Sequence, residues 1–161
     1  MKIKLILSLL CTLAFVGCAS VPKADQTESQ KLKNTQVLAQ GKSGIYVYRN
    51  NSYQGAALKK DIWINGECLG ESSKGIFFYK EVDGDQDYII STESEFSPNH
   101  LTLAVQSGQN YYIQQKIKMG VVVGGAKLEK VDEVQAQKII SQLDLGVQGH
   151  CSKQHIELPK K

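Results

Sequence analysis

The first 18 residues constrain this chain most, because they decide the compartment in which it folds. Two lysines lie within Met1–Lys4, and an apolar run of signal-peptide length follows at Leu5–Phe15. A membrane-spanning helix needs about 20 apolar residues, so this run is too short to be one. Small residues flank Cys18, as is usual at a signal cleavage site. The pattern predicts export from the cytoplasm.

The residues around Cys18 resemble the lipobox of bacterial lipoprotein signals. Val16, Gly17, Cys18 and Ala19 fit it well, whereas Phe15 stands where Leu is more common. The resemblance implies removal of residues 1–17, acylation of Cys18, and attachment to a membrane of the cell envelope. Residues 19 and 20 lack the Asp that retains enterobacterial lipoproteins at the inner membrane, which favours the outer membrane, facing the periplasm. The alternative is an ordinary secretory signal with an incidental cysteine.

Length and charge restrict the remaining chain. Of the 161 residues, those after the signal suffice for one domain with a proper core but not comfortably for two. The formal net charge of +3 includes Lys2 and Lys4, so the exported part is nearly neutral. Because no basic patch or basic helix is present in the sequence, we do not expect nucleic acid as a partner.

Two cysteines remain after lipidation and cleavage, Cys68 and Cys151. In an oxidising compartment, a disulfide between them is the economical interpretation. The alternative is a metal site made from these cysteines with His150 and His155, but the spacings that mark zinc sites are missing. We therefore predict a disulfide, with no metal and no cofactor.

Residues 18–43 are interpreted as the lipidated Cys and a tether. Residues 19–43 are polar and show no strand alternation, and a flexible coil over 19–41 would span on the order of 25 Å. A weak helix could form over 28–39, with Thr27 as its N-cap. The segment is predicted to be a spacer or a disordered terminus.

Short alternating runs separated by turn residues begin at Gly44 and are typical of an antiparallel β domain. Asn65-Gly66 is the strongest hairpin signal in the chain. In the run 101–105, alternation points Leu101, Leu103 and Val105 inward. The predicted strands are 45–49, 60–64, 67–71, 75–80, 86–91, 101–105, 110–117, a buried valine run at 119–123, and 126–129.

One helix is predicted after the last strand, with Asp132 and Gln135 forming a capping box and an end near Leu143. Its buried side is expected to carry Val131, Ala136, Ile139, Ile140 and Leu143. The sequence therefore predicts a mainly β domain over 44–145, an antiparallel β-sandwich with one C-terminal helix. Residues 146–161 form a polar tail that Cys151 can fasten to the strand carrying Cys68.

Four motifs follow one another along the chain: Ile-Tyr-Val-Tyr-Arg at 45–49, Ile-Asn-Gly-Glu-Cys-Leu-Gly at 64–70, Gly-Ile-Phe-Phe at 75–78 and Ser-Gly-Gln-Asn-Tyr-Tyr-Ile at 107–113. Together they resemble the lipoproteins of the domain-of-unknown-function 2846 family, and the match spans roughly residues 43–137. The resemblance implies a small β-sandwich, similar in shape to prealbumin-like and PEGA-type modules, on an envelope lipoprotein. It implies no assigned activity. The family's usual Pro-Gly-x-His turn is replaced by Asp83-Gly84-Asp85.

Signals for catalysis are weak. The histidines His100, His150 and His155 do not lie in a setting typical of a catalytic base, and no Gly-x-Ser-x-Gly motif is present. The glycine-rich run 120–128 fails as a phosphate loop, because Ala126 precedes Lys127 and Leu128 replaces the hydroxyl residue. The acids at 83, 85 and 87 are interpreted as solvated turn carboxylates, since calcium loops need more ligands. We expect no catalytic residue.

Several strands place an aromatic residue beside another apolar residue, so that both faces of a sheet carry bulk. One face must be core, and the other could receive a partner. Tyr48, Arg49, Tyr111 and Tyr112 are the candidate partner surface, because Tyr and Arg are enriched in contact hot spots. The competing interpretation places these aromatics in the core and in cross-strand pairs.

Two functions remain open. The favoured hypothesis is a non-enzymatic binding or structural module, anchored in the membrane through acyl chains on Cys18, with an envelope protein or glycan as its partner. The alternative is a ligand-binding or inhibitory sandwich that captures a peptide, a glycan or a small apolar molecule. An open aromatic-lined cavity would favour the alternative.

Overall fold

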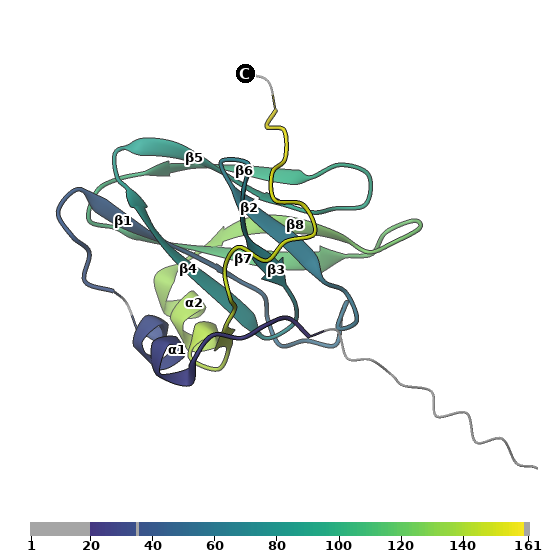
Figure 1. Ribbon diagram of the computed structural model, residues 1–161, viewed down its shortest axis with the longest axis horizontal. Coiled ribbons are helices and arrows are strands. Elements are labelled where there is room, and N and C mark those ends of the chain that lie inside the picture. The colour runs from purple at the N-terminus through teal and green to yellow at the C-terminus, as the bar shows by residue number, and fades with distance from the viewer. Residues whose placement is uncertain (1–19, 35, 160–161) are drawn as a thin grey trace, which may run out of the picture.

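The computed structural model describes residues 20–34 and 36–159. The signal segment and the predicted lipidation site Cys18 lie outside the described residues. Two sheets pack face to face, and two helices lie against the outer side of one sheet (Figure 1). The predicted β-sandwich is confirmed.

Within the described residues, nine strands build the two sheets. The five-stranded sheet has the order β8-β7-β1-β4-β9, and the four-stranded sheet has the order β3-β2-β5-β6. In chain order, the strands are β1 (Lys42–Tyr48), β2 (Lys60–Ile64), β3 (Glu67–Ser72), β4 (Ile76–Asp83), β5 (Gln86–Thr92), β6 (Asn99–Val105), β7 (Asn110–Lys118), β8 (Gly125–Val131) and β9 (Asp144–Leu145). The helices are α1 (Gln26–Lys33) and α2 (Glu133–Ile140).

The sequence predicted antiparallel sheets, but the sheets contain parallel pairs as well. Strand β1 pairs in parallel with β7, and β4 pairs in parallel with β9. Parallel neighbours need a long connection between them, and these pairs join segments far apart in the chain. Alternation within each strand cannot reveal such pairings.

The local signals that depend on neighbouring residues are confirmed. Asn65 and Gly66 both have positive φ, 51° and 81°, as the tight β2–β3 hairpin requires. The Asp132 carboxylate accepts a hydrogen bond from the Gln135 N–H at 2.9 Å, which caps α2. Leu103 and Val105 are buried and Leu101 packs beside them.

Two apolar clusters hold the layers together. The larger lies between the sheets and includes Val47, Ile62, Phe78, Ile90 and Ile113. The second lies between the five-stranded sheet and α2, where the Tyr46 ring stacks on Tyr112 at 4.9 Å between ring centroids. Helix α2 is therefore a third layer over the outer face of this sheet, which accounts for the bulk on both faces of its strands.

The valine run 119–123 does not form the predicted buried strand. It is the loop of the β7–β8 hairpin, and Met119, Val121 and Val122 are 91%, 89% and 80% exposed. The neighbouring glycines allow the chain to reverse its direction between β7 and β8. The apolar composition of the run did not indicate this reversal.

The predicted tether is also wrong for residues 20–33. Val21 is 7% exposed and joins the inter-sheet core, and Ser29 of α1 is fully buried. The Ala24 N–H donates to the Leu145 carbonyl at 2.8 Å, and the Val147 N–H donates to the Pro22 carbonyl at 3.0 Å. The helix begins after Asp25, which caps it, and not after Thr27. The N-terminal segment is therefore part of the folded domain.

Candidate interaction surface

The four residues predicted as a partner surface are buried. Tyr48, Arg49, Tyr111 and Tyr112 are 0%, 2%, 5% and 2% exposed. Tyr48 and Tyr112 face α2, whereas Tyr111 faces the inter-sheet core. Burial raises the pKa of Tyr48 to about 12. The predicted surface is wrong, because a helix that is distant in sequence covers one face and the second sheet covers the other.

Arg49 stabilises a loop from inside the molecule. Its guanidinium donates to the carbonyl of Leu58 at 2.8 Å and to the carbonyl of Gly55. Burial lowers the pKa of Arg49 to about 10. Within the described part of the chain, no carboxylate forms an ion pair with Arg49.

A polar cavity of about 310 Å³ opens beside Arg49. The buried side-chain oxygen of Gln115 has no hydrogen-bond partner among the described residues, although its amide nitrogen donates to Thr92 at 2.7 Å. The cavity lining includes three basic side chains and no acidic one. The lining residues are Arg49, Asn50, Ser52, Gln54, Gln114, Gln115, Lys116, Ile117 and Lys127.

Exposed apolar side chains gather in the loops at the same end of the sandwich. Of the large apolar residues that are exposed in the described ranges, all except Val37 and Val134 belong to loops 49–59, 93–98 and 119–124. Tyr48 of β1 pairs with Gln114 of β7, and Ile62 of β2 pairs with Thr92 of β5, so these loops leave one end of the two sheets. We define the loop face as Tyr53, Phe96, Met119, Val121 and Val122.

Hydrogen bonds hold two of the three loops, 93–98 and 119–124, against each other, and Arg49 holds loop 49–59 from inside the molecule. The Glu95 carboxylate accepts from the N–H groups of Val121, Val122 and Val123. These bonds lower the pKa of Glu95 below its ordinary value. The Ala126 N–H donates to the Ser94 hydroxyl at 3.3 Å. The loop face is thus a supported surface and not a set of independent loops.

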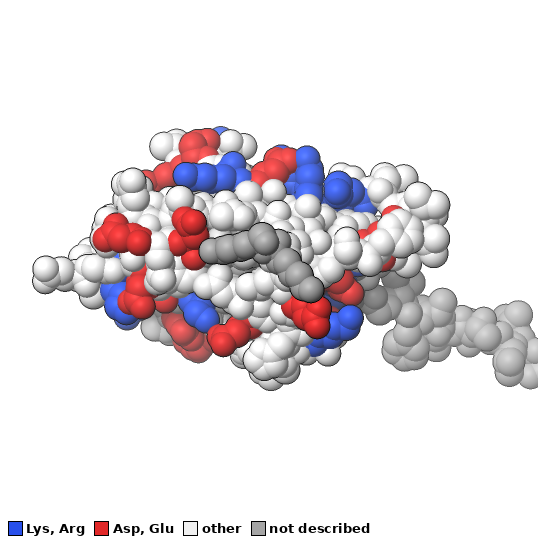
Figure 2. All heavy atoms as spheres, turned by 90° about the horizontal axis from the view of Figure 1, so that it is seen from above, with Lys and Arg blue, Asp and Glu red and all other residues white. Residues whose placement is uncertain are grey.

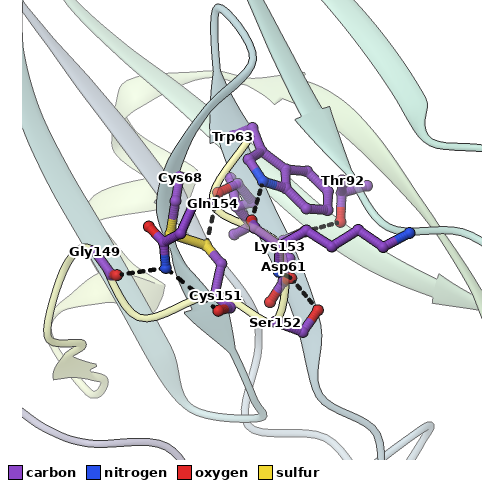
Figure 3. Close-up of a disulfide and its surroundings, with 10 residues drawn as sticks. Asp61, Trp63, Cys68, Thr92, Gly149, Cys151, Ser152, Lys153 and Gln154 are labelled. Carbon is purple, nitrogen blue, oxygen red and sulfur yellow. Dashed lines mark hydrogen bonds between the residues drawn. A yellow bond between two sulfur atoms is a disulfide. The ribbon is translucent and has the colours of Figure 1, made fainter. Parts of the chain in front are cut away.

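The C-terminal tail covers the edge of the four-stranded sheet (Figure 3). The predicted disulfide between Cys68 and Cys151 is present, and the N–H of Cys68 donates to the Gln154 carbonyl at 2.9 Å. The Trp63 indole N–H donates to the Lys153 carbonyl at 2.8 Å, and the Asp61 carboxylate accepts from the Ser152 hydroxyl. The Cys68 bond, with the bonds from Glu71 N–H to the His150 carbonyl and from Gly149 N–H to the Leu69 carbonyl, covers the outer edge of β3, which would otherwise present unpaired backbone groups.

One serine–histidine pair and one acidic turn are the features of the described residues that most resemble a catalytic or metal-binding grouping. The closest approach to a nucleophile–base pair is Ser91 with His100, at 2.8 Å, but Ser91 is completely buried. Across residues 20–34 and 36–159, no group of three or more His, Cys, Asp or Glu side chains could hold a metal ion. Asp85 of the acidic turn accepts two hydrogen bonds from Ser107, and Asp83 pairs with Lys42. In the described ranges, no helix has the length and apolar character needed to cross a bilayer.

Fold and surface together define a class: a β-sandwich module whose N-terminal segment and disulfide-bonded C-terminal tail are both docked on the sheets. The chain belongs to the DUF2846 family of proteins of unknown function, whose family model matches residues 39–126. A relative from Haemophilus influenzae, named only as an uncharacterized protein, is 46% identical over 131 residues, which cover 81% of this chain and 77% of the relative. No solved structure matches the chain.

Proposed function

We propose that the mature protein is a lipid-anchored, non-enzymatic binding or structural module of the bacterial envelope, seated directly on its membrane. The proposal places the acyl chains on Cys18 and the domain on the periplasmic side of the outer membrane. The lipobox resemblance around Cys18 supports the anchor. The main support for a domain that lies directly on the membrane is that the chain is docked on the domain from Val21 onward.

Val21 restricts how far the domain can stand from an anchor. Its side chain is buried between the sheets, and Cys18 lies three positions before it. An extended chain spans at most about 3.5 Å per residue, so the link from Cys18 to Val21 reaches roughly 10 Å. Lys23 also forms an ion pair with Asp144 at 2.7 Å. A domain held this closely acts at the membrane surface and not at a distance from it.

The anchor is tested with Cys18→Ala behind a cleavable secretory signal. The unchanged chain should fractionate with the outer membrane and carry the mass of two or three acyl chains, and the variant should be soluble and unacylated. In-cell crosslinking of both forms, followed by mass spectrometry, identifies any partner that requires the anchor. An unchanged chain that is released as a soluble protein without added mass would contradict the proposal.

The cavity beside Arg49 favours a second candidate function, the capture of a small acidic ligand. Its lining is polar, and its three basic side chains outnumber the one carboxylate, Glu129, that pairs with both Lys116 and Lys127. This suits a peptide carboxylate or an acidic sugar better than a small apolar molecule. Titration with acidic mono- and disaccharides and short acidic peptides, followed by NMR shifts of the Gln115 side-chain amide, tests this function. Equal shifts in a Lys127→Ala variant would count against the cavity as the binding site.

A further inference from the structure

We propose that the loop face contacts the lipid bilayer and orients the domain on it. The inference rests on the lipid-anchored module proposed above and adds the surface that meets the membrane. Tyr53 and Phe96 are 97% and 83% exposed, and the three loop-face residues of the β7–β8 hairpin are at least 80% exposed. Large apolar side chains that gather at one end of a domain mark a surface that contacts another molecule or a membrane.

The position of the N-terminal segment favours lipid as the occupant. Lys23 pairs with Asp144, and the Asp144 N–H donates to the Gly75 carbonyl at 2.9 Å. The Gly75 N–H in turn donates to the Arg49 carbonyl at 3.2 Å, and Arg49 binds the loop that carries Tyr53. Four successive contacts therefore connect the segment that follows the anchor to the loop face.

Figure 1 shows the same relation, because the purple start of the described chain runs from α1 towards the side on which these loops lie. Before Val21, only Cys18, Ala19 and Ser20 remain in a chain cleaved at the lipobox. The anchor thus holds Val21 within roughly 10 Å of the acyl chains.

The composition of the loop face suits a membrane interface. Valine, methionine and phenylalanine gain from leaving water, and tyrosine is enriched at the level of the lipid headgroups. Glu95 uses its carboxylate to bind the valine amides, so those backbone groups are already satisfied when the loop leaves water.

The face seen in Figure 2 offers no basic cluster that could bind a membrane by charge. On the face seen in Figure 2, acidic and basic side chains are interspersed without an extended region of one sign. A peripheral protein that binds by charge needs a basic cluster. The contact proposed here is apolar and should change little with salt.

Depth-dependent quenching by brominated lipids tests the contact in the full, acylated chain in phosphatidylcholine vesicles. Phe96→Trp places a reporter on the loop face, and Val134→Trp, on α2 and 82% exposed, is the matched control. We expect strong quenching for Phe96→Trp and little for Val134→Trp, after subtraction of the signal from Trp63 in the unchanged chain. Equal quenching at the two sites, or none at residue 96, would overturn the proposal.

The unacylated Cys18→Ala chain separates failure of this inference from failure of the anchor. It should partition weakly into the same vesicles, and Val121→Ser with Val122→Ser should lower the partition coefficient roughly tenfold. Val134→Ser should leave it unchanged. An acylated chain that floats with vesicles but shows no quenching refutes the loop-face contact and leaves the anchor in place. If the unchanged chain does not float with vesicles, the anchor has failed. In that case, absence of quenching in the unacylated chain refutes the loop-face contact independently of the anchor.

Discussion

At the scale of single residues, Arg49 belongs to a residue type that is enriched in interface hot spots, yet here it stabilises the interior of the domain. Its buried guanidinium satisfies two carbonyls of the loop that carries Tyr53. Arg49→Ala would leave both carbonyls without these donors and remove a packed side chain. We expect a loss of about 2–4 kcal/mol in the free energy of unfolding, measured by urea denaturation.

The matched control for Arg49 is Lys118→Ala, a basic residue that is exposed at the end of β7. Its unfolding free energy should stay within about 0.5 kcal/mol of the unchanged protein. If Arg49→Ala were equally neutral, the guanidinium would not be holding the loop that carries Tyr53.

Glu95 gives a pH dependence at the same scale. Because bonds to the valine amides lower its pKa in the folded state, those bonds persist above the ordinary value of 4.5 and are lost as the pH falls through the lowered pKa. The NMR amide signals of Val121 and Val122 should therefore move with a midpoint below 4.5. Glu95→Gln should abolish this transition, whereas a midpoint at or above 4.5 would contradict the hydrogen bonds.

At the scale of elements, the disulfide joins a tail to a strand 83 positions away. Closing a loop of this length restricts the unfolded chain and is worth about 4–5 kcal/mol in the chain-entropy model. Replacing Cys68 and Cys151 together by Ser should lower the unfolding free energy by up to that amount, measured by thermal and urea denaturation. The tail should also gain hydrogen exchange at the Cys68 and Ile156 amides, and unchanged protection there would show that the tail docks without the bond.

The sequence predicted features that depend on local chemistry and missed features that depend on contacts between distant segments. The hairpin at Asn65-Gly66, the cap at Asp132 and the pairing of Cys68 with Cys151 depend on turn chemistry, capping or compartment, and all three are confirmed. The burial of Tyr48 and the docking of Val21 depend on segments that meet only in the folded chain. A local sequence pattern cannot predict such tertiary contacts.

The loop face was missed for a related reason. A run such as Val121–Val123 has the composition of a buried strand, and only its place at a hairpin tip makes it exposed. The glycines at 120, 124 and 125 are the available signal, because they border the three valines closely on both sides.

At the scale of the whole molecule, the two ends of the sandwich differ in chemistry. The loop face is apolar, whereas the opposite end carries the turns with Asp83 and Asp85, each held by hydrogen bonds or an ion pair. Contact of the loop face with lipid would therefore direct this polar end, and the sheet edge covered by the tail, towards the aqueous compartment. A partner in that compartment would meet those surfaces first.

This orientation depends on the short distance between anchor and domain, which gives a last prediction. The loop face binds lipid weakly by itself, so its contact depends on the effective concentration that the anchor imposes. A flexible Gly-Ser segment of about 20 residues inserted after Ala19 should leave flotation with vesicles unchanged and reduce the quenching of the Phe96→Trp reporter by brominated lipids. The same segment added after Pro159 should leave both signals unchanged. Full quenching despite the inserted linker would mean that the loop face binds lipid without help from the anchor, and that the docking of Val21 has no part in orienting the domain.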